Sequence, residues 1–278
     1  MKPFYPLAAL FSCALFSGCF DHREAPARPV TARSEGEISE RREAVQRIVL
    51  NGAEGPALPA VLASAPHLET LHLRDAKLTD FSGLASLAGL RELDLSGVRM
   101  EQAPAELEAL AHLERLYLSG CGLTAFPSSA SAKSLVYLNL DRNRIASLPD
   151  ELPVGLRWLR LNANRLTDLP DAIGRLADLR RIYLNDNVLT NLPASFASLT
   201  ALEDVALAGN RLTSFPEVLV ALPKLRNLDL RGNAGIAALP AGIGEMKALR
   251  TLTLAGCRIP KEERDRIRKA LPDCVINF

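Results

Sequence analysis

The chain has 278 residues, a formal net charge of +1 and 48% hydrophobic residues. This length allows a large core. The net charge of the whole chain is near zero, so it gives no reason to expect nucleic-acid binding. The five cysteines contain no C-x-x-C pair and no Cys/His spacing suited to zinc, so neither a metal site nor a cofactor is expected.

The first 18 residues have the pattern of an export signal. Lys2 precedes a short apolar stretch over 7–16, which is too short to span a membrane. The segment Phe16-Ser17-Gly18-Cys19 resembles the lipobox of bacterial lipoproteins. That resemblance implies cleavage before Cys19 and acylation of its thiol, which would anchor the protein to a membrane. Two alternatives stay open: an ordinary cleaved signal with a chance cysteine, and an earlier lipobox-like segment over 10–13.

In the bacterial lipoproteins that this segment resembles, sorting between membranes depends on the residue after the acylated cysteine. That residue is Phe20, and Asp21 comes only one position later, which favours the outer membrane with the protein facing the periplasm. A cell-surface or secreted location is the alternative. Residues 19–36 lack apolar periodicity and predict a flexible tether, and residues 37–44 predict a cap helix preceded by a capping-box pattern at Ser34 and Glu37.

The stretch 156–178 shows the unit from which most of the chain is built. Leu159 and Leu161 alternate with period 2, so they share one face of a short strand while Trp158 and Arg160 point to the other face. Asn164 follows at the turn, where its amide can satisfy backbone groups. One such unit cannot bury enough apolar surface to offset its own ordering, so it must stack on neighbours.

Ten first-strand positions recur at steps of 21 to 24 residues. They are Val45, Leu68, Leu90, Leu113, Leu135, Leu156, Leu179, Leu202, Leu225 and Leu249. With the L-x-x-L-x-L-x-x-N pattern, residues 45–259 resemble the leucine-rich repeat family. The resemblance implies an α/β fold, a curved horseshoe solenoid of about ten coils. Its concave face carries a parallel sheet and its convex face carries short helical or irregular segments.

The turn position that Asn164 occupies varies along the array. The central and C-terminal coils have asparagine there, and Cys121 and Cys257 take the same position. Residues 260–278 break the pattern and predict a C-terminal cap made of a helix and a short strand. Cys257 and Cys274 are either a disulfide pair in an oxidising compartment or two buried free thiols.

The candidate binding site lies on the outward side of the strands, at the second, fourth and sixth residues after each first-strand position. The one tryptophan and every tyrosine after the signal segment fall in these three columns, interleaved with arginines. Because Trp, Tyr and Arg dominate the energetics of protein interfaces, they predict a protein- or peptide-binding surface. The predicted contact residues are Arg115, Tyr117, Tyr137, Asn139, Trp158, Arg160, Arg181 and Tyr183.

An alternative explanation is that large polar aromatic residues simply suit strands. That explanation does not account for their absence from the outer strands. The acidic residues nearby, such as Asp94 and Asp141, argue against nucleic acid.

Catalysis has little support in the sequence. His72 and Asp94 are neighbours in one column, but no candidate nucleophile accompanies them. We therefore expect a monomeric, non-enzymatic, lipid-anchored binding module of the cell envelope. The alternative is an exported host-interaction factor or a structural envelope protein without a single dominant binding site.

Overall fold

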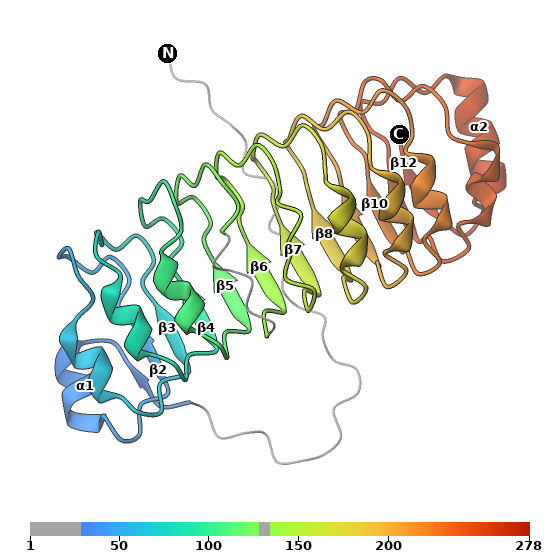
Figure 1. The fold of residues 1–278 in the computed structure, drawn as a ribbon. Helices are drawn as coiled ribbons and strands as arrows, with labels where there is room; N and C mark the ends of the chain where they lie inside the picture. The colour runs from blue at the N-terminus through green and yellow to red at the C-terminus, as the bar shows by residue number, and fades with distance from the viewer. Residues whose placement is uncertain (1–28, 128–133) are drawn as a thin grey trace, which may run out of the picture.

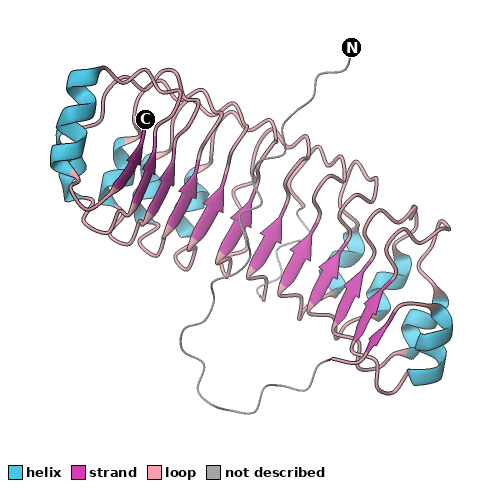
Figure 2. Ribbon diagram, turned by 180° about the vertical axis from the view of Figure 1, so that it is seen from behind, coloured by secondary structure: helices cyan, strands magenta, loops and turns pink. Residues whose placement is uncertain are grey.

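The computed structural model describes residues 29–127 and 134–278, and these form one open solenoid. Twelve strands make a single parallel sheet in which spatial order follows chain order from β1 to β12. The strands line one face of the arc and short helices line the other (Figure 1, Figure 2). No helix in these two ranges is long and apolar enough to cross a membrane.

Most strands are three residues long and sit at the positions that the repeat predicts. They are β1 (Thr31–Ala32), β2 (Arg47–Val49), β3 (Thr70–His72), β4 (Glu92–Asp94), β5 (Arg115–Tyr117), β6 (Tyr137–Asn139), β7 (Trp158–Arg160), β8 (Arg181–Tyr183), β9 (Asp204–Ala206), β10 (Asn227–Asp229), β11 (Thr251–Thr253) and β12 (Val275–Asn277). The expected ten coils are therefore flanked by one further strand at each end.

Two α-helices close the ends of the solenoid, and five-residue 3-10 helices cover its convex side. The helices are α1 (Glu35–Arg41), η1 (Ala60–Ser64), η2 (Ser82–Ser86), η3 (Ala105–Ala109), η5 (Asp171–Arg175), η6 (Ala194–Ser198), η7 (Glu217–Ala221), η8 (Ala241–Glu245) and α2 (Lys261–Ala270). Among these described 3-10 helices, all except η2 begin directly after a proline. Proline has no N–H to donate, so it suits a position just before or at the start of a helix.

The inward leucines of successive coils form one continuous core. In the coil of β7, Leu156, Leu159, Leu161 and Leu166 are all fully buried. Each coil contributes the same positions, and all belong to one hydrophobic cluster that runs the length of the array. Burial of roughly 1.5–3 kcal/mol per such side chain is the main stabilising contribution.

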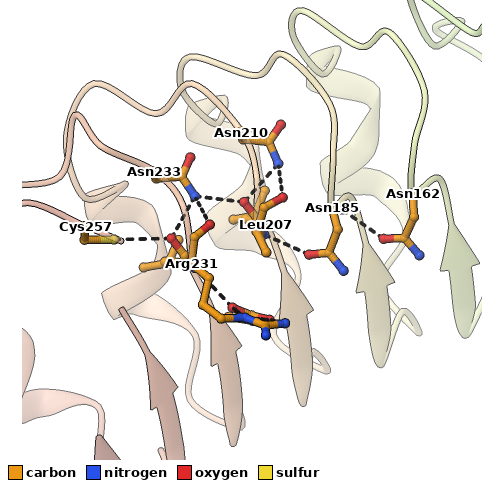
Figure 3. A network of polar contacts seen from close by, with 10 residues as sticks. Asn162, Asn185, Leu207, Asn210, Arg231, Asn233 and Cys257 are labelled. Carbon is orange, nitrogen blue, oxygen red and sulfur yellow. Dashed lines mark hydrogen bonds and ion pairs between the residues drawn. The ribbon is translucent and has the colours of Figure 1, made fainter. Parts of the chain in front are cut away.

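A ladder of asparagine side chains joins the coils at their turns (Figure 3). The Nδ2 of Asn187 donates to the carbonyl of Leu184 in its own coil at 3.0 Å and to that of Leu161 in the preceding coil at 2.9 Å. Its Oδ1 accepts the backbone N–H of Leu166 at 3.1 Å. The other asparagines of the ladder repeat this pattern: Asn143, Asn164, Asn210 and Asn233.

The two ladder cysteines reproduce only part of the asparagine pattern. The thiol of Cys121 donates to the carbonyl of Leu95 at 3.2 Å, and that of Cys257 to the carbonyl of Leu230 at 3.3 Å. Each therefore bonds the preceding coil, but a thiol has a single S–H donor where an asparagine amide has two N–H donors.

The N-terminal end differs from the sequence-based expectation in its boundaries. The first part of the predicted tether (19–36), up to residue 28, lies outside the described residues. Within its second part, Thr31–Ala32 pair with β2, and Ala32 is fully buried. The tether prediction is therefore wrong for the residues that form this strand. Helix α1 spans Glu35–Arg41 instead of 37–44, because Ser34 caps it at the predicted capping box: the Glu37 N–H donates to Ser34 Oγ at 3.3 Å.

The C-terminal end consists of α2 followed by β12, which pairs with β11. The Phe278 ring lies beneath Arg264 and Arg268 of α2, with their Cζ atoms 5.4 and 5.0 Å from the ring centroid. Cys257 and Cys274 are both free thiols in this structure, as in the second alternative, but only Cys257 is buried and Cys274 is half-buried.

Candidate functional site

The strand register places the predicted contact residues side by side on the concave face. Arg115, Tyr137, Trp158 and Arg181 are consecutive register partners across β5, β6, β7 and β8. A second column, two residues further along each strand, brings together Tyr117, Asn139, Arg160 and Tyr183. All eight residues predicted from the sequence therefore lie on one surface, with neighbouring strands about 4.8 Å apart.

Four aromatic rings form an unbroken chain across these strands. The centroids of Tyr117 and Tyr137 are 4.8 Å apart, those of Tyr137 and Trp158 are 5.0 Å apart, and those of Trp158 and Tyr183 are 6.0 Å apart. The last two pairs meet edge to face, at 78° and 70°, a favourable arrangement for aromatic pairs. All four side chains are half-buried, so they pack on one another while still presenting surface to solvent. We call these four residues the aromatic row.

Two arginines hold the row by binding a ring and a carboxylate at once. Arg181 has its Cζ 4.9 Å from the Trp158 ring centroid, and its Nε lies 2.9 Å from Asp204 Oδ2. Arg160 has its Cζ 5.4 Å from the Tyr183 centroid, and its Nη2 lies 2.7 Å from Asp141 Oδ2. Each guanidinium is fixed from two sides, which reduces the conformational entropy left to lose when a partner binds.

Arg115 behaves differently from the other two arginines. It turns away from the row and pairs with Glu92, with Nε 2.7 Å from Oε2. His72 Nε2 lies 2.8 Å from the other oxygen of the same carboxylate. These contacts, with the His72 hydrogen bond the strongest, lower the pKa of Glu92 to about 2.

His72 and Asp94 are register partners on β3 and β4, which confirms that they are neighbours, but the hydrogen bond of His72 goes to Glu92. Asp94 instead pairs with Arg74 and is fully buried.

Burial on the concave face shifts the tyrosines toward their neutral form. It raises the pKa of Tyr137 to about 12, and it also raises the pKa values of Tyr117 and Tyr183. Protonated phenols keep both a donor and an acceptor available. The aromatic row therefore offers hydrogen bonds without negative charge at any physiological pH.

Every carboxylate in the three outward columns has a cationic partner. Besides the four acids already named, Asp229 pairs with Arg231 at 2.7 Å. The columns hold six arginines and five carboxylates, so their net formal charge is about +1. The concave face is thus rich in charges that compensate one another within the protein.

A second ladder of side-chain hydrogen bonds runs beside the asparagine ladder, and it was not predicted from the sequence. Asp141 Oδ1 accepts the N–H of Asn162 at 2.8 Å. Asn162 Oδ1 accepts the N–H of Asn185 at 2.9 Å (Figure 3), and Asn185 Oδ1 accepts that of Ala208 at 2.8 Å. The signal was present as three consecutive Asp or Asn residues in the third column. This ladder holds the ends of the strands that carry the row.

The described residues contain no group of three or more His, Cys, Asp or Glu side chains that could hold a metal ion. A shallow cleft of about 440 Å³ lies between the coils at the Leu-Pro segments, lined by residues such as Leu192, Phe215 and Leu239. None of the eight predicted contact residues lines it. Cys19, the predicted lipidation site, lies outside the described residues.

Comparison with known families agrees with the repeat pattern. Residues 152–277 match the model of a leucine-rich repeat region, and residues 112–132 match that of a single leucine-rich repeat. The sequence matches none of the curated proteins.

Several solved structures share the fold. A leucine-rich repeat protein of Leptospira interrogans is 27% identical, with a TM-score of 0.58, over 87% of this chain and 74% of that one. An internalin of Listeria monocytogenes is 17% identical, with a TM-score of 0.56, over 88% and 82%. A plant peptide hormone receptor, RGFR1, in complex with RGF2 is 24% identical, with a TM-score of 0.63, over 76% of this chain and 40% of the receptor.

Proposed function

The chain belongs to the leucine-rich repeat family, and from this premise we propose that it is a non-enzymatic binding module whose concave face receives a protein or peptide. The observation that carries the proposal is the aromatic row with its fixed arginines. Tyr, Trp and Arg are the residues that most often dominate binding energy, and rigid anchors lose little entropy on association. The similar plant receptor was solved in complex with RGF2, which supports the same use of the fold.

The module is tethered to the cell envelope through Cys19 and acts as a monomer in this proposal. The lipobox-like segment before Cys19 supports the anchor, and Phe20 after it supports an outer-membrane location facing the periplasm. A cell-surface or secreted location remains the alternative, and labelling of intact cells separates the two. A periplasm-facing protein stays unlabelled by a reagent that does not cross the outer membrane.

The binding surface is tested by crosslinking in the native organism from a photoreactive residue at position 158. The double variant Trp158→Ala with Tyr137→Ala should lose binding to the captured partner by at least about tenfold, a typical loss for two central anchors. The matched control is Thr251→Ala with Thr253→Ala, which truncates two outward side chains of β11, away from the row. Equal binding by both double variants would refute the concave-site proposal.

The anchor is tested by metabolic labelling with palmitate. Wild type should incorporate label and Cys19→Ser should not, while Cys13→Ser controls for the earlier lipobox-like segment. Incorporation that is equal in wild type and Cys19→Ser would rule out Cys19 as the lipidated residue.

A further inference from the structure

The backbone of the aromatic row's strands is already fully engaged, which limits how a partner can bind there. Each of β5, β6, β7 and β8 pairs with a neighbouring strand on both sides. The free edges of the sheet lie at β1 and β12, far from the row along the array. An extended peptide therefore cannot add a strand at this site, and recognition must come from side chains.

The apolar surface is long and narrow. Its two middle rings lie in the first column and its two end rings in the second. Three ion pairs surround it: Arg115–Glu92 at one end, Arg181–Asp204 at the other and Arg160–Asp141 along one side. An amphipathic helix presents an apolar stripe at least about 100° wide, which would force part of that stripe onto these ion pairs. The row's shape favours a thin ligand lying along it.

The charges around the row point to an uncharged ligand. Glu92, Asp141 and Asp204 each hold their arginine within 2.9 Å. An acidic or a basic ligand would compete with these contacts, and it would have to separate a half-buried pair to form its own. A neutral ligand leaves them intact.

The ring arrangement suits a ligand with small rigid rings and free carbonyls. Edge-to-face packing leaves angular notches between rings, not one flat platform. The Trp158 Nε1 is buried, so the polar groups that the row can offer a ligand are the tyrosine hydroxyls. A polyproline II helix has no internal hydrogen bonds, so its carbonyls are free to accept from these hydroxyls, and its proline rings pack between aromatic rings.

We propose that the aromatic row binds an uncharged, proline-rich segment of the protein partner in the polyproline II conformation, running across β5 to β8. Tyr117 and Tyr183 share one column three strands apart, so the row spans about 14 Å. At about 3.1 Å per residue this length accommodates roughly five residues. The inference rests on the proposed binding function and specifies the chemistry of the ligand.

Trp158 makes a direct test possible, because it is the only tryptophan in the chain and lies within the row. A blocked octaproline peptide is titrated into the full chain while tryptophan emission is followed. We expect a saturable change, with a Kd that moves less than about twofold between low and high salt, since no charge is exchanged. Tyr117→Ala and Tyr183→Ala should each raise the Kd by about tenfold, whereas Thr251→Ala on β11 should leave it unchanged.

A variant that keeps the aromatic ring distinguishes a loss of binding from a loss of folding. Tyr183→Phe retains the packing surface, so it should bind octaproline within about threefold of wild type if the ring carries the interaction. Blocked hexaglutamate and a neutral cellohexaose serve as comparison ligands. Saturable binding of either one without octaproline binding would overturn the proposal in favour of an acidic peptide or a glycan.

The outcome separates this inference from the function on which it rests. If the photoreactive residue at position 158 captures a protein but octaproline produces no change, the binding function stands and the proline-rich ligand is wrong. If neither probe reports binding, both proposals fail.

Discussion

Arg181 lies over the indole of Trp158, with Cζ 4.9 Å from the ring centroid, while its Nε lies 2.9 Å from Asp204. The carboxylate on β9 thus positions a cation on a ring two strands away. A cation–π contact of this kind contributes about 0.5–1 kcal/mol at an exposed site and more when desolvated. Its main role here is to hold the central ring of the row in one orientation.

Removing the Arg181 side chain should uncover the indole. Arg181→Ala is expected to shift the emission maximum of Trp158 to longer wavelength, because water gains access to the ring face that the guanidinium covered. Unfolding free energy should fall by only about 1 kcal/mol. The signal has no competing source, since the chain has one tryptophan.

Arg231→Ala is the control for this measurement, because Arg231 pairs with Asp229 on a distant coil. An equal emission shift in both variants would mean that the Arg181–Trp158 contact does not shape the environment of the ring.

The asparagine ladder predicts an ordered series of stabilities at position 187. Asn187→Ala leaves the buried N–H of Leu166 without its partner. It also removes one of the two asparagine donors from each of the carbonyls of Leu161 and Leu184, which keep their bonds to Asn164 and Asn210. An unmet buried N–H costs about 1–3 kcal/mol and a lost hydrogen bond about 0.5–1.5 kcal/mol, so the unfolding free energy should fall by roughly 2–4 kcal/mol.

Asn187→Cys should lose less than Asn187→Ala, because Cys121 and Cys257 donate to the preceding coil from the same position. Denaturant midpoints of the three proteins would measure the order. A cysteine variant no more stable than the alanine variant would show that the thiol contributes nothing to the ladder.

The strands and the inward leucines could be predicted because one short pattern recurs in every coil. The period-2 alternation within each strand places Leu159 and Leu161 in the core and Trp158 and Arg160 on the outward face, without any knowledge of tertiary contacts. The end strand Thr31–Ala32 could not be found in this way, since it belongs to no repeat and is defined only by its pairing with β2.

The candidate site was predictable as a set of residues but not as a set of contacts. The register brings Arg115 beside Tyr137, yet Arg115 bonds Glu92 on the other side. Long side chains choose among several neighbours within reach, and the sequence pattern carries no information about that choice. Tyr117 and Tyr183 join the row across columns, which spacing along one column does not show.

The residue seven places after each first-strand position has a left-handed backbone in all ten coils, and this gives a stability prediction. Six of these residues are glycine, but Ala163 has φ of 54°. A residue with a Cβ costs about 1–2 kcal/mol of stability in the left-handed backbone conformation. Ala163→Gly should therefore raise the unfolding free energy by roughly 0.5–1 kcal/mol, after the greater flexibility of glycine in the unfolded chain is counted.

The reciprocal change is Gly209→Ala, at the same position two coils later. Gly209 has φ of 66°, and a Cβ there would lie 2.5 Å from Asp186 Oδ1. That variant should be destabilised by at least about 1 kcal/mol. Thermal unfolding of both proteins tests the pair, and a destabilised Ala163→Gly would contradict the assignment of strain to this position.

Glu92 predicts how stability depends on pH. Its pKa is about 2 in the folded protein against an ordinary value of 4.5, mainly because His72 and Arg115 bond its carboxylate. A folded-state pKa below the unfolded one means that the unfolded chain takes up the proton first on acidification. The stabilisation is therefore complete above about pH 4.5 and is lost as the pH falls from 4.5 toward 2.

The unfolding free energies of wild type and Glu92→Gln should consequently differ most near neutral pH and become equal in acid. A pKa lowered from 4.5 to about 2 corresponds to roughly 3 kcal/mol at pH 6, and the difference should fall close to zero near pH 2. Urea unfolding at half-unit pH intervals measures it, with Glu108→Gln on the exposed side of η3 as the variant expected to show no such trend. A Glu92→Gln difference that stays constant from pH 6 to pH 2 would mean that the carboxylate contributes through shape alone and not through its charge.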